Sequence, residues 1–390
     1  MYEAVIVDVA RTAIGRRKGL LSGVHPVDLL GNLLREVVSR NGFAPEVVDD
    51  VIVGCVMQAG EQALNVGRNA WLSAGLPESV PATTVDRQCG SSLQALHFAA
   101  QGVMAGVYDV VIAAGVESMT RVPMGVTVRD IGSPKTQALT DRYNLGEHWF
   151  SQAVGAEMIA KQWGLSRAQL DEYSLRSHQL AHQAATQGAF LRQIVPVTVV
   201  GADGNEQVVK ADEGIRPSTS FEKLTALQPA FDNLDLITAG NSSQISDGAS
   251  AVLVMSREAA QRYGLRPRAR FVSFAVVGDD PVKMLTGPIP ATKKALSKAG
   301  LTVDDIHLFE VNEAFAPVVL AWQHETGAAW DKVNVNGGAI ALGHPLGATG
   351  TRIVTTLVSE LERREQRFGL VTICEGGGTA NATIIERMSE

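Results

Sequence analysis

The stretch LREVVSRNGFAPEVVDDVIVG, residues 34–54, contains the pattern that decides the fold of this chain. It holds the end of an apolar helical pattern, then a glycine, then a β-branched run typical of a buried strand. A similar order of features returns in ALSKAGLTVDDIHLFEV, residues 295–311. In each stretch a glycine, Gly42 or Gly300, is predicted to end the helix in the left-handed conformation that glycine adopts at low cost. We therefore expect two similar units in one chain.

The spacing of these matches supports an internal repeat. Asp50 and Asp305 precede the two strand runs and lie 255 residues apart. Further along the chain, the apolar run Val110–Ala114 resembles Leu370–Cys374 in character. A single match of this kind arises by chance in proteins that alternate strands and helices. Three matches in the same order favour a repeat.

Strand-like runs alternate with helical patterns along the chain. The strand-like runs are Ala4–Val9, Val51–Val56, Val110–Ala114, Ala251–Met255, Ala269–Val277, Ile306–Val311 and Leu370–Cys374. The helical patterns include Asp28–Arg40, Ser91–Ala105, Ala291–Lys298 and Arg352–Arg363. This alternation predicts an α/β fold around a largely buried sheet.

The segment 117–244 fits neither unit, because it is more polar and has a helical pattern of its own over Ser166–Gly188. We expect a first half, residues 1–116 plus 245–266, that is interrupted by an inserted loop domain, residues 117–244. A second half, residues 267–390, follows. Insertions of this size often carry substrate-binding or oligomer contacts.

Composition excludes several classes of protein. Of the 390 residues, 45% are hydrophobic and 19% are charged, which excludes a disordered chain. The net charge of −7 argues against nucleic acid or an anionic membrane as a partner. The cysteines, Cys55, Cys89 and Cys374, are an odd number, which argues against a disulfide framework. No zinc-binding pattern, transmembrane run or signal peptide is expected, so the simplest compartment is the cytoplasm.

Cys89 lies in DRQCGSSLQALHFAA, directly before a helical apolar pattern. The free N–H groups and the dipole of a helix N-terminus favour a thiolate, which is what a nucleophilic cysteine needs. The alternative is a small buried core cysteine. Applying the 255-residue offset to Cys89 leads to His344, in NGGAIALGHPLGATG. A cysteine and a histidine at equivalent points of two facing units would form a nucleophile and its base, although an isolated histidine is more often structural.

Two further stretches place polar groups at strand ends. Cys374, in TICEGGGTA, precedes glycines that can leave N–H groups free as oxyanion donors, and a second cysteine there could transfer protons. Asn312, in EVNEAFAPVV, could hold a water or a carbonyl oxygen. The alternatives are a core cysteine and an ordinary turn residue. Cys55, within an apolar strand run, is interpreted as structural.

Taken together, CGSS, GNSSQISDGA, VNEAFA, NGGAIALGHPLGATG and CEGGG resemble the motif set of the thiolase family, in the family's order and over essentially the whole chain. The resemblance implies a five-layered αβαβα sandwich of two similar halves with an inserted loop domain. It also implies a homodimer or homotetramer.

The resemblance assigns catalytic roles. Cys89 would carry the acyl group as a thioester, and His344 would activate it. Asn312 would position a water in the first oxyanion hole. Cys374 would take or return the α-proton of acetyl-CoA, while the backbone N–H groups of Cys89 and Gly376 would form the second oxyanion hole.

For coenzyme A binding, the resemblance points to Arg216 near the nucleotide, Ser243 on the pantetheine and Phe315 along its tunnel. The sequence departs from the common family pattern at Ala380, at Gln244 and around His148. These departures leave the chemistry in place and bear on the length or bulk of the acyl chain.

The expected activity is CoA-dependent cleavage of a 3-ketoacyl-CoA to acetyl-CoA and a shortened acyl-CoA, in a degradative direction. A short-chain acetyl-CoA acetyltransferase is the nearest alternative. A decarboxylating condensing enzyme is disfavoured by Cys374, and a non-catalytic acyl-CoA or lipid binder by the filled catalytic positions. A cysteine hydrolase would need an acyl-enzyme that is open to water. No metal or permanently bound cofactor is expected, and coenzyme A would act as a substrate.

Overall fold

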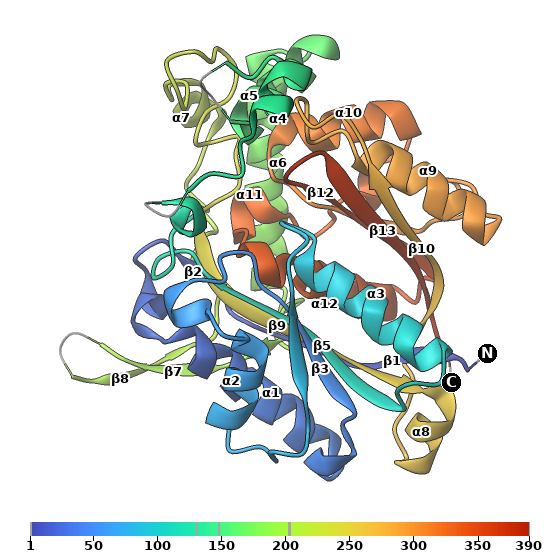
Figure 1. Ribbon diagram of the computed structural model, residues 1–390. Helices are drawn as coiled ribbons and strands as arrows, with labels where there is room; N and C mark the ends of the chain where they lie inside the picture. The colour runs from blue at the N-terminus through green and yellow to red at the C-terminus, as the bar shows by residue number, and fades with distance from the viewer. Residues whose placement is uncertain (1, 130–131, 147–148, 202–203, 390) are drawn as a thin grey trace.

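The computed structural model describes residues 2–129, 132–146, 149–201 and 204–389 (Figure 1). The strands are β1 (Ala4–Thr12), β2 (Gly15–Arg16), β3 (Asp50–Gly54), β4 (Ala82–Val85), β5 (Val110–Ser118), β6 (Ile194–Val195), β7 (Val197–Val200), β8 (Glu206–Val209), β9 (Ser246–Ser256), β10 (Ala269–Gly278), β11 (Leu308–Val311), β12 (Phe368–Glu375) and β13 (Thr379–Arg387). The α-helices are α1 (Pro26–Asn41), α2 (Val66–Ser73), α3 (Ser91–Met104), α4 (Gln137–Tyr143), α5 (Gln152–Gln162), α6 (Arg167–Thr186), α7 (Phe221–Thr225), α8 (Arg257–Arg262), α9 (Pro288–Ala299), α10 (Ala316–Thr326), α11 (Ala339–Leu342) and α12 (Thr349–Arg363).

The strand order repeats between the two halves. In the first half β3 pairs in parallel with β5, which pairs with β9, which pairs with β1. In the second half β11 pairs in parallel with β12, which pairs with β13, which pairs with β10. A short antiparallel contact between β1 and β10, at Val5–Arg270 and Ile6–Ala269, joins the halves into one hydrogen-bonded path. The predicted internal repeat is thus present in the topology.

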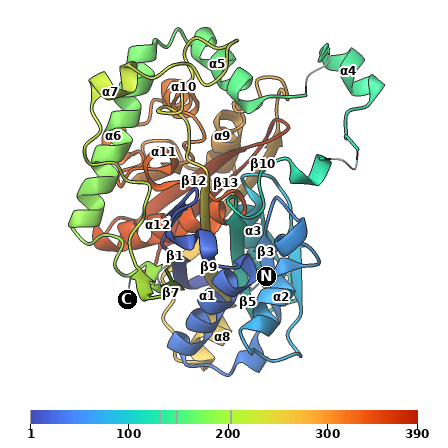
Figure 2. The same ribbon diagram turned by 90° about the vertical axis from the view of Figure 1, so that its left-hand side faces the viewer.

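Side-chain alternation along the strands produces the layers. On β5, Val110 and Ile112 pack into the core shared with α1 and α2, whereas Val111 and Ala113 pack into the core shared with α3 and α12. Strands of the second half contribute to that same middle core, and their other face packs against α9 and α10. The order of layers is helices, sheet, helices, sheet, helices, as Figures 1 and 2 show. The predicted α/β sandwich is confirmed.

The glycines that decided the fold have the expected geometry. Gly42 ends α1 with φ of 69°, and Gly300 ends α9 with φ of 66°. Both values lie in the left-handed region, which carries a steric penalty for residues with a Cβ atom. Each glycine turns the chain back toward the parallel strand that follows.

The repeat is offset by 258 residues rather than 255. β3 begins at Asp50 and β11 at Leu308, and α3 begins at Ser91 and α12 at Thr349. The equivalent of Cys89 is therefore Gly347, and the predicted equivalence of Cys89 with His344 is wrong. The aspartate pairs misled the alignment because the second half has a longer turn between its aspartates and its strand.

The N-termini of α3 and α12 meet in the middle layer without room for extra atoms. A Cβ atom built on Gly350 would lie 2.1 Å from the backbone nitrogen of Leu93, and one on Gly115 would lie 2.2 Å from the Gly347 carbonyl oxygen. The Thr351 backbone N–H donates to Ser92 Oγ at 3.0 Å. Backbone approach at these glycines brings the two helix starts together.

The chain between β5 and β9, which are neighbours in the sheet, carries α4 to α7 and the separate β7–β8 hairpin. The predicted helix is α6, which begins at Ser166 with a reciprocal capping box to Gln169. Figure 2 shows α6 along the second half and α4 standing away from the body of the molecule. No helix in the described ranges is long and apolar enough to cross a membrane.

Candidate active site

Cys89 lies two residues before α3, in a strained turn. Gln88 has φ of 48°, which is unusual for a residue other than glycine, and its N–H donates to Asp86 Oδ1 at 2.7 Å. The Gly90 and Ser91 N–H groups donate to the carbonyl oxygens of Arg87 and Gln88. The turn fixes Cys89 at the helix N-terminus, as the sequence predicts, with only 2% of its surface exposed.

The second half brings Cys374 and Gly376 to the Cys89 thiol. Cys374 is fully buried on β12, close enough to Cys89 that ionisation of the Cys89 thiol would raise the pKa of Cys374. The backbone N–H groups of Cys89 and Gly376 favour the ionised form of the Cys89 thiol and act to lower its pKa. Gly377 and Gly378, both with positive φ, form the turn from β12 to β13. The structure thus assembles two thiols and a pair of backbone donors in one place.

Both thiols are held in their protonated forms. Burial, and then the nearby Glu375 carboxylate, raise the pKa of Cys89 to about 12, although the two backbone hydrogen bonds oppose the rise. Burial also raises the pKa of Cys374 well above its ordinary value. The predicted preference for a thiolate at the helix N-terminus is therefore wrong for the free site, because burial outweighs the helix dipole. The Cys89 thiol needs a base.

Hydrogen bonding and burial fix His344 in one tautomer. Thr349 Oγ1 lies 2.7 Å from His344 Nδ1 and donates its only hydrogen to the Pro345 carbonyl at 2.8 Å. It must therefore accept from Nδ1–H, which leaves Nε2 unprotonated. Burial, with the Arg352 charge, lowers the pKa of His344 to about 3, so the ring is neutral. Its Nε2 can accept a proton.

Asn312 follows β11 and faces His344. Its Nδ2 lies 3.4 Å from His344 Nε2, and its Oδ1 is buried without a hydrogen-bond partner among the described residues. The backbone N–H of Asn312 donates to Thr372 on the neighbouring strand, which fixes the strand end. Asn312 and His344 are thus brought together as predicted, with one polar oxygen left to interact with something else.

Glu117, at the end of β5, hydrogen-bonds to the backbone of both halves near the site. Its carboxylate accepts from the backbone N–H groups of Val56, Met57 and Gly347 and from the Gln62 amide. The Gly347 bond, 2.8 Å long, reaches the loop that carries His344. Sequence analysis missed this residue, since a glutamate at a strand end gives no signal until its partners are known.

Gln244 hydrogen-bonds to the loop that carries His344 and also lines a surface pocket. Its carbonyl oxygen accepts from the His344 N–H, and its side-chain amide donates to the carbonyl oxygens of Gly214 and Ile340. A pocket of about 420 Å³ begins at Gln244 and is lined at its outer part by Arg216 and Lys223. Arg216 is exposed, whereas both thiols are buried.

Ser243 and Phe315 do not line this pocket, but Ser243 is the chain neighbour of Gln244, which does. The Ser243 N–H donates to the Ala314 carbonyl, and Ser242 forms an isolated bridge with Phe315, which precedes α10. Both predicted residues are half-buried beside Gln244. His148, the remaining position considered in the sequence, lies outside the described residues.

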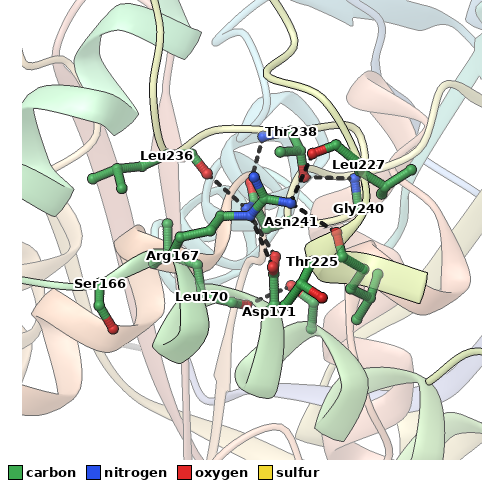
Figure 3. A network of polar contacts seen from close by, with 12 residues as sticks. Ser166, Arg167, Leu170, Asp171, Thr225, Leu227, Leu236, Thr238, Gly240 and Asn241 are labelled. Atoms are coloured by element: carbon green, nitrogen blue, oxygen red, sulfur yellow. Dashed lines mark hydrogen bonds and ion pairs between the residues drawn. The ribbon is translucent and has the colours of Figure 1, made fainter. Parts of the chain in front are cut away.

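A polar network on α6 fixes the loop that forms the wall of this pocket (Figure 3). Arg167 donates to Asp171 at 2.8 Å and to the carbonyl oxygens of Leu224 and Leu227. Asn241 donates to Asp171 and accepts from the Thr238 N–H. The inserted segment thereby orients the start of the GNSSQ motif.

Comparison with known proteins agrees with this geometry. Residues 4–258 match the family model for the thiolase N-terminal domain, and residues 265–387 match that for the thiolase C-terminal domain. A steroid 3-ketoacyl-CoA thiolase, FadA6, from Mycobacterium tuberculosis is 50% identical over 100% of this chain and 95% of its own. A 3-ketoacyl-CoA thiolase from Bacillus subtilis is 46% identical over 99% of this chain and 100% of its own.

Among solved structures, the Bacillus anthracis acetyl-CoA acetyltransferase superposes with a TM-score of 0.92 at 39% identity, covering 100% of this chain and 99% of its own. With both halves matched by family models, full-length relatives near half identity and the same fold, the chain belongs to the thiolase family.

Proposed function

We propose that this protein is a 3-ketoacyl-CoA thiolase, an acyltransferase that uses coenzyme A to cleave a 3-ketoacyl-CoA into acetyl-CoA and a shortened acyl-CoA. The proposal is supported by buried groups suited to this chemistry: a neutral histidine, His344, and two thiols, Cys89 and Cys374, with backbone N–H groups near Cys89. The relatives named above as 3-ketoacyl-CoA thiolases support the same activity. The roles proposed below for the individual residues are consistent with this arrangement.

In the first half-reaction, His344 Nε2 takes the proton of the Cys89 thiol, and Cys89 Sγ attacks the 3-keto carbon. The bond between C2 and C3 breaks, which leaves the acyl group on Cys89 and an enolate of acetyl-CoA. Cys374 Sγ–H then protonates C2. In this proposal His344, and Asn312 through a water, donate hydrogen bonds to the enolate oxygen; the 3.4 Å separation of Asn312 Nδ2 and His344 Nε2 supports this pairing.

In the second half-reaction, the Cys374 thiolate takes the proton of the coenzyme A thiol, and the sulfur attacks the acyl group on Cys89. The Cys89 thiolate leaves and recovers its proton from His344. The backbone N–H groups of Cys89 and Gly376 stabilise the tetrahedral oxyanion. The site therefore returns to its starting protonation by a ping-pong route.

Coenzyme A is proposed to bind in the pocket that begins at Gln244. Arg216 and Lys223 offer cationic groups for phosphate at its outer part. Ser243 and Phe315 are proposed to contact the pantetheine, which is supported by the nearness of Ser243 in the chain to the pocket residue Gln244 and by the bridge between Ser242 and Phe315. In this proposal the inserted domain, residues 117–244, supplies much of the cofactor-substrate contact.

A bulky acyl group is favoured by a second pocket of about 790 Å³ in the inserted segment. Its lining includes Tyr143, Trp149, Phe150 and Phe231, and such aromatic faces suit a large apolar or ring-containing acyl chain. The relative named a steroid thiolase agrees with this choice. A short-chain acetyl-CoA acetyltransferase is the second candidate, because the structural neighbour carries that name.

The test is CoA-dependent cleavage across a series from acetoacetyl-CoA to long, branched and polycyclic 3-ketoacyl-CoA thioesters. Activity that rises with acyl size supports the degradative proposal, and a matched Phe231→Ala variant should lose that rise while keeping acetoacetyl-CoA cleavage. Activity confined to acetoacetyl-CoA would favour the acetyltransferase. Absence of all cleavage would contradict the enzyme assignment and favour an acyl-CoA binder.

We further propose a homodimer or homotetramer in the cytoplasm, with halves divided at residues 1–116 plus 245–266 and at 267–390. Light scattering of the purified protein measures the assembly, and cell fractionation measures the compartment. Neither measurement depends on the catalytic assignment.

A further inference from the structure

Glu375 is a buried carboxyl group that the mechanism above does not use. It is the last residue of β12, between Cys374 and Gly376, and has no exposed surface. Its Oε2 accepts from Thr379 Oγ1 at 2.7 Å. Its Oε1 has no hydrogen-bond partner in the described part of the chain. A carboxyl group in this position, flanked by two site residues, requires an explanation.

The free oxygen of Glu375 lies against the backbone of the nucleophile. A Cβ atom built on Gly90, the residue after Cys89, would lie 1.9 Å from Glu375 Oε1 and 2.9 Å from Asn381 Oδ1. Asn381 Oδ1 is also buried without a partner in the described ranges, while its Nδ2 donates to the Gly90 carbonyl at 3.5 Å. Two acceptor oxygens therefore converge beside Gly90 with no protein donor for either.

The charged groups around Glu375 do not neutralise a carboxylate there. Arg87 is the cation that acts on it and makes no hydrogen bond to it among the described contacts, while Asp86 opposes Arg87. Cys89 and Cys374 adjoin it, and β13 presents the uncharged Thr379 and Asn381. Burial is the largest cause that raises the pKa of Glu375, to about 8.

We propose that Glu375 is held as the neutral carboxylic acid when the nucleophile forms, with its Oε1–H donated to Asn381 Oδ1, so that no second negative charge lies beside the Cys89 thiolate. This one hydrogen bond gives both Glu375 Oε1 and Asn381 Oδ1 a partner. Glu375 acts through Cys89 and is a positioning residue for charge rather than a catalytic one. This inference rests on Cys89 being the nucleophile of the proposed function.

The neutral state matters because the ionised form opposes thiolate formation. The Glu375 charge is the second-largest cause of the raised pKa of Cys89, and Glu117 on β5 adds a smaller effect of the same sign. While Glu375 is protonated, that contribution disappears and His344 can remove the Cys89 proton at lower cost. Once Glu375 ionises, each unit of added Cys89 pKa lowers the thiolate fraction about tenfold.

The experiment measures iodoacetamide alkylation of Cys89 against pH from about 6 to 10, by mass spectrometry of the Cys89 peptide, in wild type and Glu375→Gln. Both proteins should react equally below about pH 7. Above about pH 8 the wild type should fall behind, reaching a deficit of about tenfold at the alkaline end. Alkylation requires no turnover, so failure of this inference is distinguishable from absence of thiolysis, which is assayed separately.

Thr379→Val is the matched variant, because it removes a hydrogen bond that stabilises the carboxylate without changing any charge. The neutral form should then persist to higher pH, and the wild-type deficit should begin about one pH unit later. This variant also keeps the test valid if Glu375→Gln fails to fold, since it would still alkylate faster than wild type near pH 8–9.

Two results would overturn the inference. Glu375→Gln reacting faster by one constant factor across the whole range would mean that Glu375 is ionised throughout. Identical rates for wild type and both variants at every pH would mean that the Glu375 charge does not reach Cys89.

Discussion

The starts of α3 and α12 occupy equivalent places in the two halves but carry different groups. Before α3, a strained turn presents Cys89 two residues ahead of the helix. Before α12, a longer loop presents His344 five residues ahead of the helix, and Thr349 in the first turn orients the ring. The strands that lead to the two helices repeat each other in order and direction. In the proposed mechanism, one supersecondary unit therefore supplies the nucleophile, and its copy supplies the base.

The difference teaches that the loops before the helices, and not the sheets, divide the chemistry. Cys89 has one backbone donor, its own N–H, but no side-chain base from its own half, and Gly376 of the other half supplies the second donor. The tautomer of His344 is fixed by a residue of the helix that follows it, but the loop that carries His344 has no nucleophilic side chain. Glu117 and the close glycines then join the two loops. Neither half holds a complete site.

The largest expected effect comes from removing either member of this pair. Cys89→Ala and His344→Ala should each lower thiolysis by at least about a thousandfold, because one removes the acyl carrier and the other its base. A spectrophotometric cleavage assay measures the loss, with circular dichroism as the control for folding. If Cys89→Ala kept substantial activity, the division of chemistry between the two helix starts would be wrong.

Cys374→Ala should lower thiolysis by about 10²- to 10⁴-fold, because it removes the buried thiol that is proposed to protonate the enolate. Cys55→Ala is the matched control, as Cys55 is buried on the far side of Glu117 and should retain most activity. Near-normal thiolysis by Cys374→Ala would sink the assigned proton transfer. Comparing the two variants then shows whether the thiol on β12 contributes to catalysis.

Thr349→Val should lower the turnover number about tenfold, with a smaller effect on KM. The valine keeps the side-chain shape but cannot accept from His344 Nδ1, so the imidazole loses its fixed tautomer. Steady-state kinetics at several pH values measure the change. An unaltered turnover number would mean that the α12 start positions His344 by backbone contacts alone, as the α3 start positions Cys89.

Arg216→Ala has the smallest expected effect, a rise of about fivefold in KM for coenzyme A with little change in turnover number, because an exposed cation contributes about 1 kcal/mol at most. The exposed Arg192→Ala serves as the matched control. A large loss of turnover number would show that the pocket entrance is coupled to the catalytic loop through Gln244.

Local sequence signals predicted much of the fold. Gly42 and Gly300 specify their helix ends by backbone conformation alone, so a single sequence suffices to find them. The candidate site residues were also within reach, because Cys89, Asn312, His344 and Cys374 each adjoin a recognisable strand or helix end. Their roles stay a prediction until the variants are measured.

The features that could not be predicted from the sequence depend on burial by residues that are far apart in the chain. The raised pKa of Cys89 depends on Glu375 and on burial by the other half, neither of which is visible in the residues around Cys89. Likewise, Arg352 has a charged guanidinium in the middle layer without a hydrogen-bond partner in the described ranges. The repeat offset was predicted wrongly for a related reason. The length of a turn can change without altering which strands pair.

The contacts at Gly115 and Gly350 have a consequence for how such a protein can change over generations. Even an added methyl group at either position would collide with backbone of the opposite half, and backbone cannot move aside as a side chain can. Few substitutions at these positions near the site would therefore be neutral. Innovation in substrate range must come from the segment between β5 and β9, whose lining residues face open pockets and can be exchanged one at a time.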